Sequence, residues 1–245
     1  YVSHTVSHYK GRIDNWEVFN EKFYQKTPDE AYVNLVRKTI ATARKVNPSV
    51  KIGGPCGPPE EVPSALDFWR TIGEKGLLKD FDFITGHFYV GGGGTYPIDQ
   101  DAALDGMLSR VREICDKYGA KNKPLWNSEA GMGPNQSFFV GRNTAYGIFA
   151  GSGFNQRDPV PYQVGAAMMA RFALTHLWHN CRWYYYYCGG GYGNDWAMCD
   201  FSDFTPLPLA IAYEQTNRMM KGAVAAARVK VDGGIFGFKY KVKKT

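Results

Sequence analysis

Apolar residues recur along this chain of 245 residues with two spacings that alternate from one segment to the next. Apolar positions three and four residues apart predict helices over residues 29–46, 63–76, 101–118, 162–178 and 207–220. Short apolar runs of strand length lie at residues 16–20, 49–54, 81–89, 124–129 and 181–188. Strands that alternate with helices in this way predict an α/β fold with a parallel sheet, either a barrel or an open sheet.

The pattern changes after Gly222. The last part of the chain reads AARVKVD and then GIFGFKYKVKK, which is typical of short alternating strands without a helix between them. We therefore expect a boundary between a first domain at residues 1–222 and a β-strand segment at residues 223–245.

The first predicted strand carries two carboxylates four residues apart, in the sequence WEVFNE. Glu17 lies about 13 Å before Glu21 along an extended chain, so it is expected inside the sheet, where a charge survives only when paired. Glu21 and its neighbour Asn20 stand at the strand's carboxyl end, where the sites of parallel α/β folds lie. We expect Glu17 to be structural and Glu21 to be the chemical group.

A second acid stands at the carboxyl end of another predicted strand. The sequence KPLWNSEAG places Glu129 at the end of the strand at residues 124–129. Two carboxyl groups, one holding a proton and one ionised, are the equipment for hydrolysis of a glycosidic bond. Glu21 and Glu129 are therefore a candidate catalytic pair.

Four motifs in this order resemble the clan A glycoside hydrolases, whose (β/α)8 TIM barrels carry Asn-Glu on strand four and Glu on strand seven. The motifs are WEVFNE at residues 16–21, GHFY at 86–89, WNSEAG at 126–131 and DFTPLPLAIAYEQTNRMMKGA at 203–223. The resemblance covers roughly residues 1–222 and is nearest to the β-xylosidase/α-L-iduronidase family. It implies that the chain supplies about strands 4–8 of the barrel, followed by the start of a β-sandwich-like segment.

The resemblance also implies a role for each matching residue. The protein would be a retaining glycosidase that cleaves a β-linked glycoside by double displacement, with Glu21 as acid/base and Glu129 as nucleophile. Asn20 would hold the sugar 2-hydroxyl, Tyr89 would hydrogen-bond the nucleophile, and His87 would line the pocket beside the acid/base.

Aromatic residues make up 15% of the chain, and aromatic rings stack against sugars as well as filling cores. The resemblance implies a stacking aromatic from the strand-eight region, near Trp183 and Tyr192, and the best candidates there are Tyr187 and Trp196. Trp16 and Trp126 are expected in the barrel core.

Composition excludes several other classes of protein. The net charge of +6 is spread along the chain without a long basic run, and no apolar run is long enough to cross a bilayer, so neither a nucleic acid nor a membrane is an expected partner. No phosphate-binding glycine motif follows a strand, which argues against a nucleotide-dependent enzyme. His4 and His8 are four residues apart but have no third ligand, so no metal and no cofactor is predicted.

The five cysteines have no zinc-type spacing and are expected as buried thiols. Cys188 and Cys199 flank a glycine-rich segment, and Asn135 begins a glycosylation sequon, which together slightly favour secretion and leave the compartment open.

An alternative function also fits this sequence. Strands one to three of the barrel have no counterpart in it, so the expected partners include a glycoside or oligosaccharide substrate and either an upstream barrel segment or a second copy of the chain. A degenerate barrel that binds carbohydrate, or serves as a structural assembly protein without catalysis, is the competing hypothesis.

Overall fold

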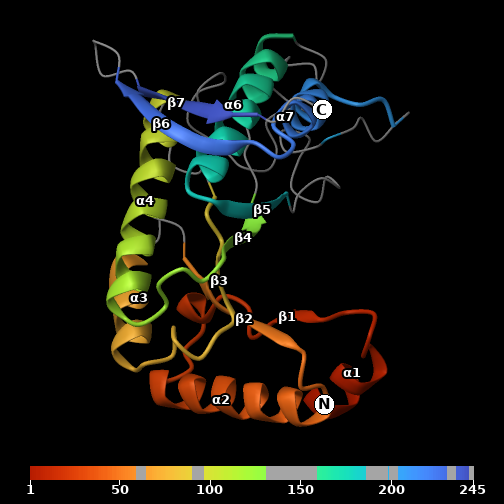
Figure 1. Cartoon of the computed structure of the whole chain (residues 1–245), viewed down its shortest axis with the longest axis vertical. Helices are drawn as coiled ribbons and strands as arrows, with labels where there is room; N and C mark the ends of the chain where they lie inside the picture. Colours follow the sequence, from red (N-terminus) through yellow and green to blue (C-terminus); the bar gives the residue numbers. More distant parts are fainter. Residues whose placement is uncertain are drawn as a thin grey trace, which may run out of the picture. The chain divides into compact units, whose positions relative to one another are not determined.

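Five strands form one sheet in the order in which they occur along the chain (Figure 1). They are β1 (Asn15–Glu17), β2 (Lys51–Gly57), β3 (Phe83–Gly86), β4 (Leu125–Ala130) and β5 (Cys181–Tyr185). The first four pair in parallel, with Trp16 opposite Ile52 and Ile84 opposite Leu125. The predicted α/β fold with a parallel sheet is confirmed.

The computed structural model describes residues 1–58, 65–89, 97–130, 159–185, 198, 204–230 and 236–242. By packing, the chain divides into a first unit, Tyr1–Phe88 with Met107–Ser128, and a second unit, Tyr89–Gly106 with Glu129–Thr245. The proposed boundary at residue 222 does not coincide with this division, and it stays a prediction.

The first unit alternates its strands with helices. These are α1 (Val2–His8), the short 3-10 turn η1 (Lys22–Tyr24), α2 (Asp29–Val46), α3 (Ala65–Glu74) and the second half of α4 (Pro97–Lys117). Helix α2 begins at the predicted residue, directly after Pro28. Asp29 and Glu30 lie in its first turn, where carboxylates interact favourably with the helix dipole and stabilise the helix. Its apolar stripe of Val33, Val36 and Ile40 is buried, and Figure 1 shows the helix running below β1 and β2.

Glycines in β2 let aromatic rings pack directly against the backbone of the sheet. A Cβ on Gly53 would lie 2.0 Å from the Phe83 ring, and one on Gly57 would lie 2.0 Å from the Trp69 ring. Trp69 is fully buried in α3. Gly53 and Gly57 therefore allow these aromatic rings to pack closely against the strand.

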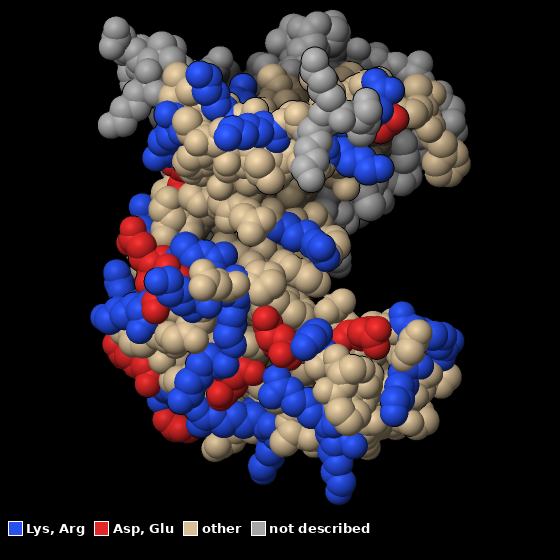
Figure 2. Space-filling view, viewed as in Figure 1, with Lys and Arg blue, Asp and Glu red and all other residues tan. Residues whose placement is uncertain are grey.

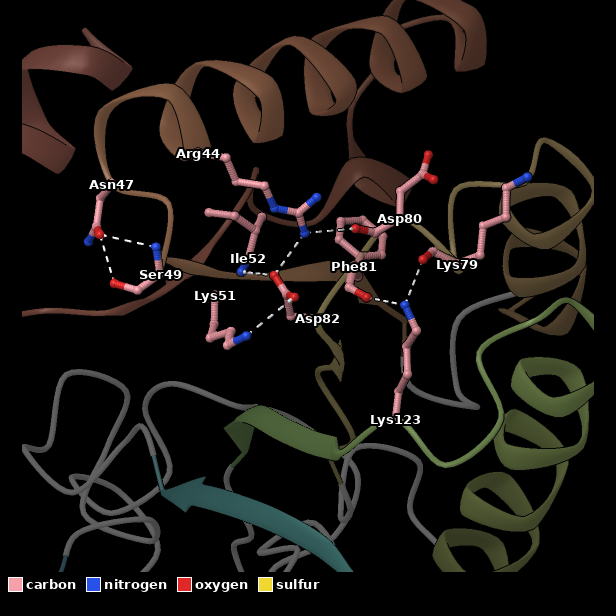
Figure 3. Close-up of polar contacts among 10 residues, drawn as sticks. All are labelled: Arg44, Asn47, Ser49, Lys51, Ile52, Lys79, Asp80, Phe81, Asp82 and Lys123. Atoms are coloured by element: carbon pink, nitrogen blue, oxygen red, sulfur yellow. Dashed lines mark hydrogen bonds and ion pairs between the residues drawn. The ribbon is translucent and has the colours of Figure 1, made fainter.

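A polar cluster joins the amino ends of β2, β3 and β4 (Figure 3). Asp82 accepts hydrogen bonds from the Ile52 amide at 2.9 Å and from Arg44 at 3.0 Å. Burial works to raise the pKa of Asp82, but the Ile52 amide and the Arg44 guanidinium hold it below its ordinary value. The Lys123 ammonium group donates to the Lys79 and Phe81 carbonyls, which ties the start of β4 to the start of β3.

The sheet curls strongly within the first unit. Glu17 lies on β1 and Ser128 on β4, and β2 and β3 stand between these two strands in the sheet. Neighbouring strands lie about 4.8 Å apart, so a flat sheet would separate β1 from β4 by about 14 Å. The Ser128 hydroxyl nevertheless donates to Glu17 Oε1 at 2.7 Å, which requires the curvature of a barrel wall.

The second unit packs helices around β5 and a hairpin. Helices α6 (Pro159–Trp178) and α7 (Pro208–Met219) pack against each other, and the strands β6 (Val224–Lys230) and β7 (Phe236–Lys241) form an antiparallel pair. The Trp178 ring stacks on Phe238 at a centroid distance of 4.8 Å, and Tyr240 donates to the Leu174 carbonyl. The predicted short strands after Gly222 therefore exist and pack on α6.

A buried acid anchors the hairpin to this unit. Asp105, on the first half of α4, accepts from His179 Nε2 at 2.9 Å and pairs with Arg228 of β6. The Asp105 side chain is 11% exposed, and its two partners offset part of the cost of removing the carboxylate from water.

Lys and Arg side chains gather along the surface of the first unit formed by α2, whose exposed cations are Arg37, Lys38, Arg44 and Lys45 (Figure 2). In this view Asp and Glu side chains interrupt the basic surface. Among the described helices, none is both long and apolar enough to cross a bilayer.

Three of the cysteines, Cys56, Cys115 and Cys181, are buried thiols, as predicted. Cys188, Cys199 and Asn135 lie outside the described residues.

One buried histidine makes the stability of the second unit depend on pH. His176 is completely buried in α6, and its Nδ1 lies 2.8 Å from the Phe172 carbonyl oxygen. Burial lowers the pKa of His176 to about 3, although the Phe172 carbonyl opposes this shift. In the unfolded chain an imidazole titrates near about 6.5. The folded pKa is the lower one, so the stabilisation is fully present above pH ~6.5 and is lost as the pH falls towards 3.

Replacing His176 with asparagine is expected to flatten this pH dependence. The asparagine amide places an N–H close to the position of Nδ1, keeps the bond to the Phe172 carbonyl and does not titrate. Urea unfolding at several pH values between 3 and 7 measures the effect, which can reach about 1.4 kcal/mol per pH unit in the wild type. His4→Asn, at an exposed position of α1, is the matched control. Equal slopes for wild type and His176→Asn would contradict the prediction.

Candidate functional site

The first half of the candidate site joins Glu21 to His87 in the first unit. Glu21 Oε1 lies 3.0 Å from His87 Nδ1, and the exposed fractions of these side chains are 25% and 1%. The carboxylate can thus reach a ligand from solvent while a buried imidazole fixes its orientation. The predicted proximity of His87 to the acid/base candidate is present in this geometry.

The backbone brings Glu21 to this position by leaving the sheet early. Strand β1 ends at Glu17, and the predicted extension of the strand to Asn20 is wrong. Val18 still donates to the Gly53 carbonyl, but Phe19 (φ 68°) and Glu21 (φ 47°) are left-handed. A non-glycine residue in this region is uncommon and often marks a functional turn. The strand alternation that we used to orient Glu21 therefore does not apply beyond Val18.

An asparagine that the sequence reasoning missed holds the backbone next to His87. Asn127 is completely buried in β4, where its Oδ1 accepts from the Phe88 amide at 2.9 Å and its Nδ2 donates to the Phe88 carbonyl at 3.0 Å. His87 itself donates its amide to the Gly57 carbonyl at 2.8 Å. The sequence contained a signal for this role, namely an asparagine within an apolar strand. A buried side-chain amide must form hydrogen bonds.

The second half of the candidate site joins Tyr89 to Glu129 in the second unit. The Tyr89 hydroxyl donates to Glu129 Oε1 at 2.5 Å, a short, charge-assisted hydrogen bond. Both residues are half-buried. The bond engages one carboxylate oxygen and gives the group a fixed orientation, which is the arrangement predicted for a nucleophile and its tyrosine partner.

The structure describes only some of the other residues that the sequence singled out. Asn20 is exposed, between the two left-handed residues Phe19 and Glu21. Tyr187 and Trp196 lie outside the described residues. Glu17 is exposed on β1, the edge strand of the sheet, so its expected burial is wrong, although the expected partner exists in the Ser128 hydroxyl.

The structure corrects some of the predictions for the tryptophans. Trp183 of β5 contacts Phe172 of α6 and Tyr213 of α7, so it is turned towards the helices. Trp16 and Trp126 are half-buried, whereas the sequence placed both in the core. Trp126 stacks on Phe83 at a centroid distance of 4.1 Å.

A buried thiol lies near the carboxyl end of β2. Cys56, in β2, is 1% exposed, and its amide donates to the Thr85 hydroxyl at 3.1 Å. Burial and the neighbouring Glu17 carboxylate raise the pKa of Cys56 well above its ordinary range. The thiol is therefore protonated at neutral pH and is not a nucleophile in this state.

No family model matches the chain, and no curated protein sequence matches it. Solved structures do match. A family 39 glycoside hydrolase from Bacteroides cellulosilyticus covers 97% of this chain at 19% identity, with a TM-score of 0.67. A family 39 β-xylosidase from Caulobacter crescentus covers 93% at 18% identity, with a TM-score of 0.55. The chain has the fold of a glycoside hydrolase barrel.

A xylanase from Cellvibrio japonicus shows the same likeness at 9% identity, with a TM-score of 0.60 over 88% of this chain. The resemblance to clan A that the four motifs indicate is thus confirmed for the fold. The chain spans 47% of the length of the Bacteroides structure and 51% of that of the Caulobacter structure.

Proposed function

We propose that this protein hydrolyses a β-linked glycoside with retention of anomeric configuration, with Glu129 as nucleophile and Glu21 as acid/base. The observation that supports the proposal most is the partner of each carboxylate. Glu129 accepts a hydrogen bond from a tyrosine hydroxyl, and Glu21 lies beside a histidine, as the resemblance to clan A glycoside hydrolases implies.

The proposed reaction requires both carboxyl groups to reach the same sugar. A separation of about 5–5.5 Å between the two carboxyl groups is the one expected for a retaining enzyme.

In the proposed mechanism the Glu129 carboxylate attacks the anomeric carbon while Glu21 gives its proton to the departing oxygen. The bond from carbon to the leaving group breaks as the ester to Glu129 forms. Glu21, now ionised, takes a proton from water, and the resulting hydroxide equivalent displaces Glu129. The Tyr89 hydroxyl orients the nucleophile through its hydrogen bond to Oε1 of Glu129. Asn20 holds the sugar 2-hydroxyl in this proposal.

The experiment is a panel of aryl β-glycosides followed by trapping with the matching 2-deoxy-2-fluoro glycosides. The fluorine destabilises the oxocarbenium-like transition states, so the covalent intermediate accumulates and its position is found by mass spectrometry of peptides. A label on Glu129 is the expected result, and a label on any other residue overturns the assignment.

The same panel tests the competing hypothesis of carbohydrate binding without catalysis. Absence of turnover and of any label, together with saturable binding of an oligosaccharide, would reject the hydrolase and support a binding or assembly role.

A further inference from the structure

A group of potential metal ligands converges at the carboxyl ends of three neighbouring strands of the first unit. Glu17 ends β1, Cys56 lies near the end of β2, and His87 follows β3. One ligand atom from each of these three side chains lies within 4.8 Å of the other two. The three segments are neighbours because β1 pairs with β2 and β2 pairs with β3. Cys56 lies where the register of β2 against β3 shifts, between Gly54 and Gly57.

The chemistry of this set suits a borderline-soft divalent cation. A thiolate, an imidazole and a carboxylate together are ligands of Zn²⁺, whose sites with three protein ligands leave a fourth position for water. Histidines that bind metals usually keep their other ring nitrogen on a carboxylate. His87 has such a carboxylate in Glu21, 3.0 Å from its Nδ1.

The spacing requires only a small adjustment. With bonds of about 2.0–2.3 Å, two ligand atoms of a tetrahedral Zn²⁺ site lie roughly 3.3–3.8 Å apart. The ligand atoms lie within 4.8 Å of one another, so the distances between them shorten by about 1 to 1.5 Å at most when the ion binds. Glu17 is exposed on the edge strand and supplies the solvent-facing side, while Cys56 and His87 supply the buried side.

We propose that Glu17, Cys56 and His87 form a binding site for Zn²⁺ or a chemically similar cation such as Cd²⁺. As the metal–sulfur bond forms, the Cys56 S–H bond breaks and its proton passes to bulk water, without any change in oxidation state. Occupancy fixes His87 as a metal ligand next to Glu21. The binding itself rests on the first unit alone, and the expected inhibition of hydrolysis rests also on the proposed function.

The test is a titration of the chain with Cd²⁺, because a Cd²⁺–thiolate bond gives an ultraviolet charge-transfer band that reports sulfur ligation directly. Wild type is expected to develop this band, and Zn²⁺ is expected to displace it. Cys56→Ser should lose the band, while Cys115→Ser, which removes another buried thiol of the same unit, should keep it. A band that persists in Cys56→Ser would overturn the proposal.

A second set of variants covers the case in which Cys56→Ser does not fold. Glu17→Gln changes an exposed residue and is expected to weaken Cd²⁺ binding. Glu21→Gln replaces the carboxyl group beside His87 and is expected to weaken the binding by about 10–100-fold. Unchanged affinity in both variants would reject the site. If wild type hydrolyses a glycoside, Zn²⁺ should inhibit wild type and spare Cys56→Ser. If no hydrolysis is found, the charge-transfer band still decides whether the metal binds.

Discussion

Replacing Glu129 with glutamine is expected to lower kcat/KM for aryl β-glycosides by on the order of 10³-fold or more. Glutamine keeps the size of the side chain and can still accept a hydrogen bond from Tyr89. It cannot form the ester with the anomeric carbon, so the effect falls on the chemical step. Initial rates with an activated aryl glycoside, with folding checked by circular dichroism, provide the measurement.

Two additions make this result specific for a nucleophile. Glu113→Gln, at an exposed position of α4, is the matched control and should keep wild-type rates. In Glu129→Ala, sodium azide should restore turnover, because the small anion fits the space of the removed carboxylate and attacks the sugar itself. The product is then the glycosyl azide of inverted configuration. Rescue that gives the retained configuration would assign Glu129 to the acid/base role.

Replacing Glu21 with alanine is expected to produce a loss that depends on the leaving group. A poor leaving group, such as an alkyl alcohol, needs the proton and should react about 10²–10⁴-fold more slowly. A dinitrophenolate leaves without protonation, so formation of the glycosyl-enzyme should be nearly unchanged. Its hydrolysis lacks a base, and a burst of released phenol followed by slow turnover is expected in stopped-flow measurements.

A uniform loss across all leaving groups would contradict this role for Glu21 and would indicate a general defect in binding or folding. Glu113→Ala is the matched control, since it removes the same group from an exposed surface. Azide is again informative, because it should accelerate the second step of Glu21→Ala and give the glycosyl azide of retained configuration. The two variants thus assign the two carboxylates independently.

The order of helices and strands was predictable because it depends on local spacing. Helix α2 begins and ends at the predicted residues, and each of the strands β2 to β5 overlaps a predicted apolar run. The helical period and the length of an apolar run are properties of the sequence within one element. The pairing of Tyr89 with Glu129 was implied by the resemblance to clan A glycoside hydrolases, and the structure contains this hydrogen bond.

The end of β1 was not predictable in this way. Alternation of side chains assumes an extended backbone up to Glu21, but the strand stops at Glu17 and two residues adopt left-handed conformations. Such conformations cost free energy that the surrounding structure must compensate, so they depend on contacts such as the one between Glu21 and His87. No pattern within WEVFNE contains that information.

The sequence by itself determined the α/β class, the order of the elements and the two acidic motifs, because these follow from local periodicity and residue type. Only the tertiary structure decided that Asn127 clamps Phe88, that Glu17 reaches Ser128 across the curled sheet, and that Cys56 lies beside Glu17 and His87. Each of these contacts joins residues that are far apart in the sequence. Their distances depend on sheet curvature and side-chain packing, which are set by the whole first unit rather than by any one segment.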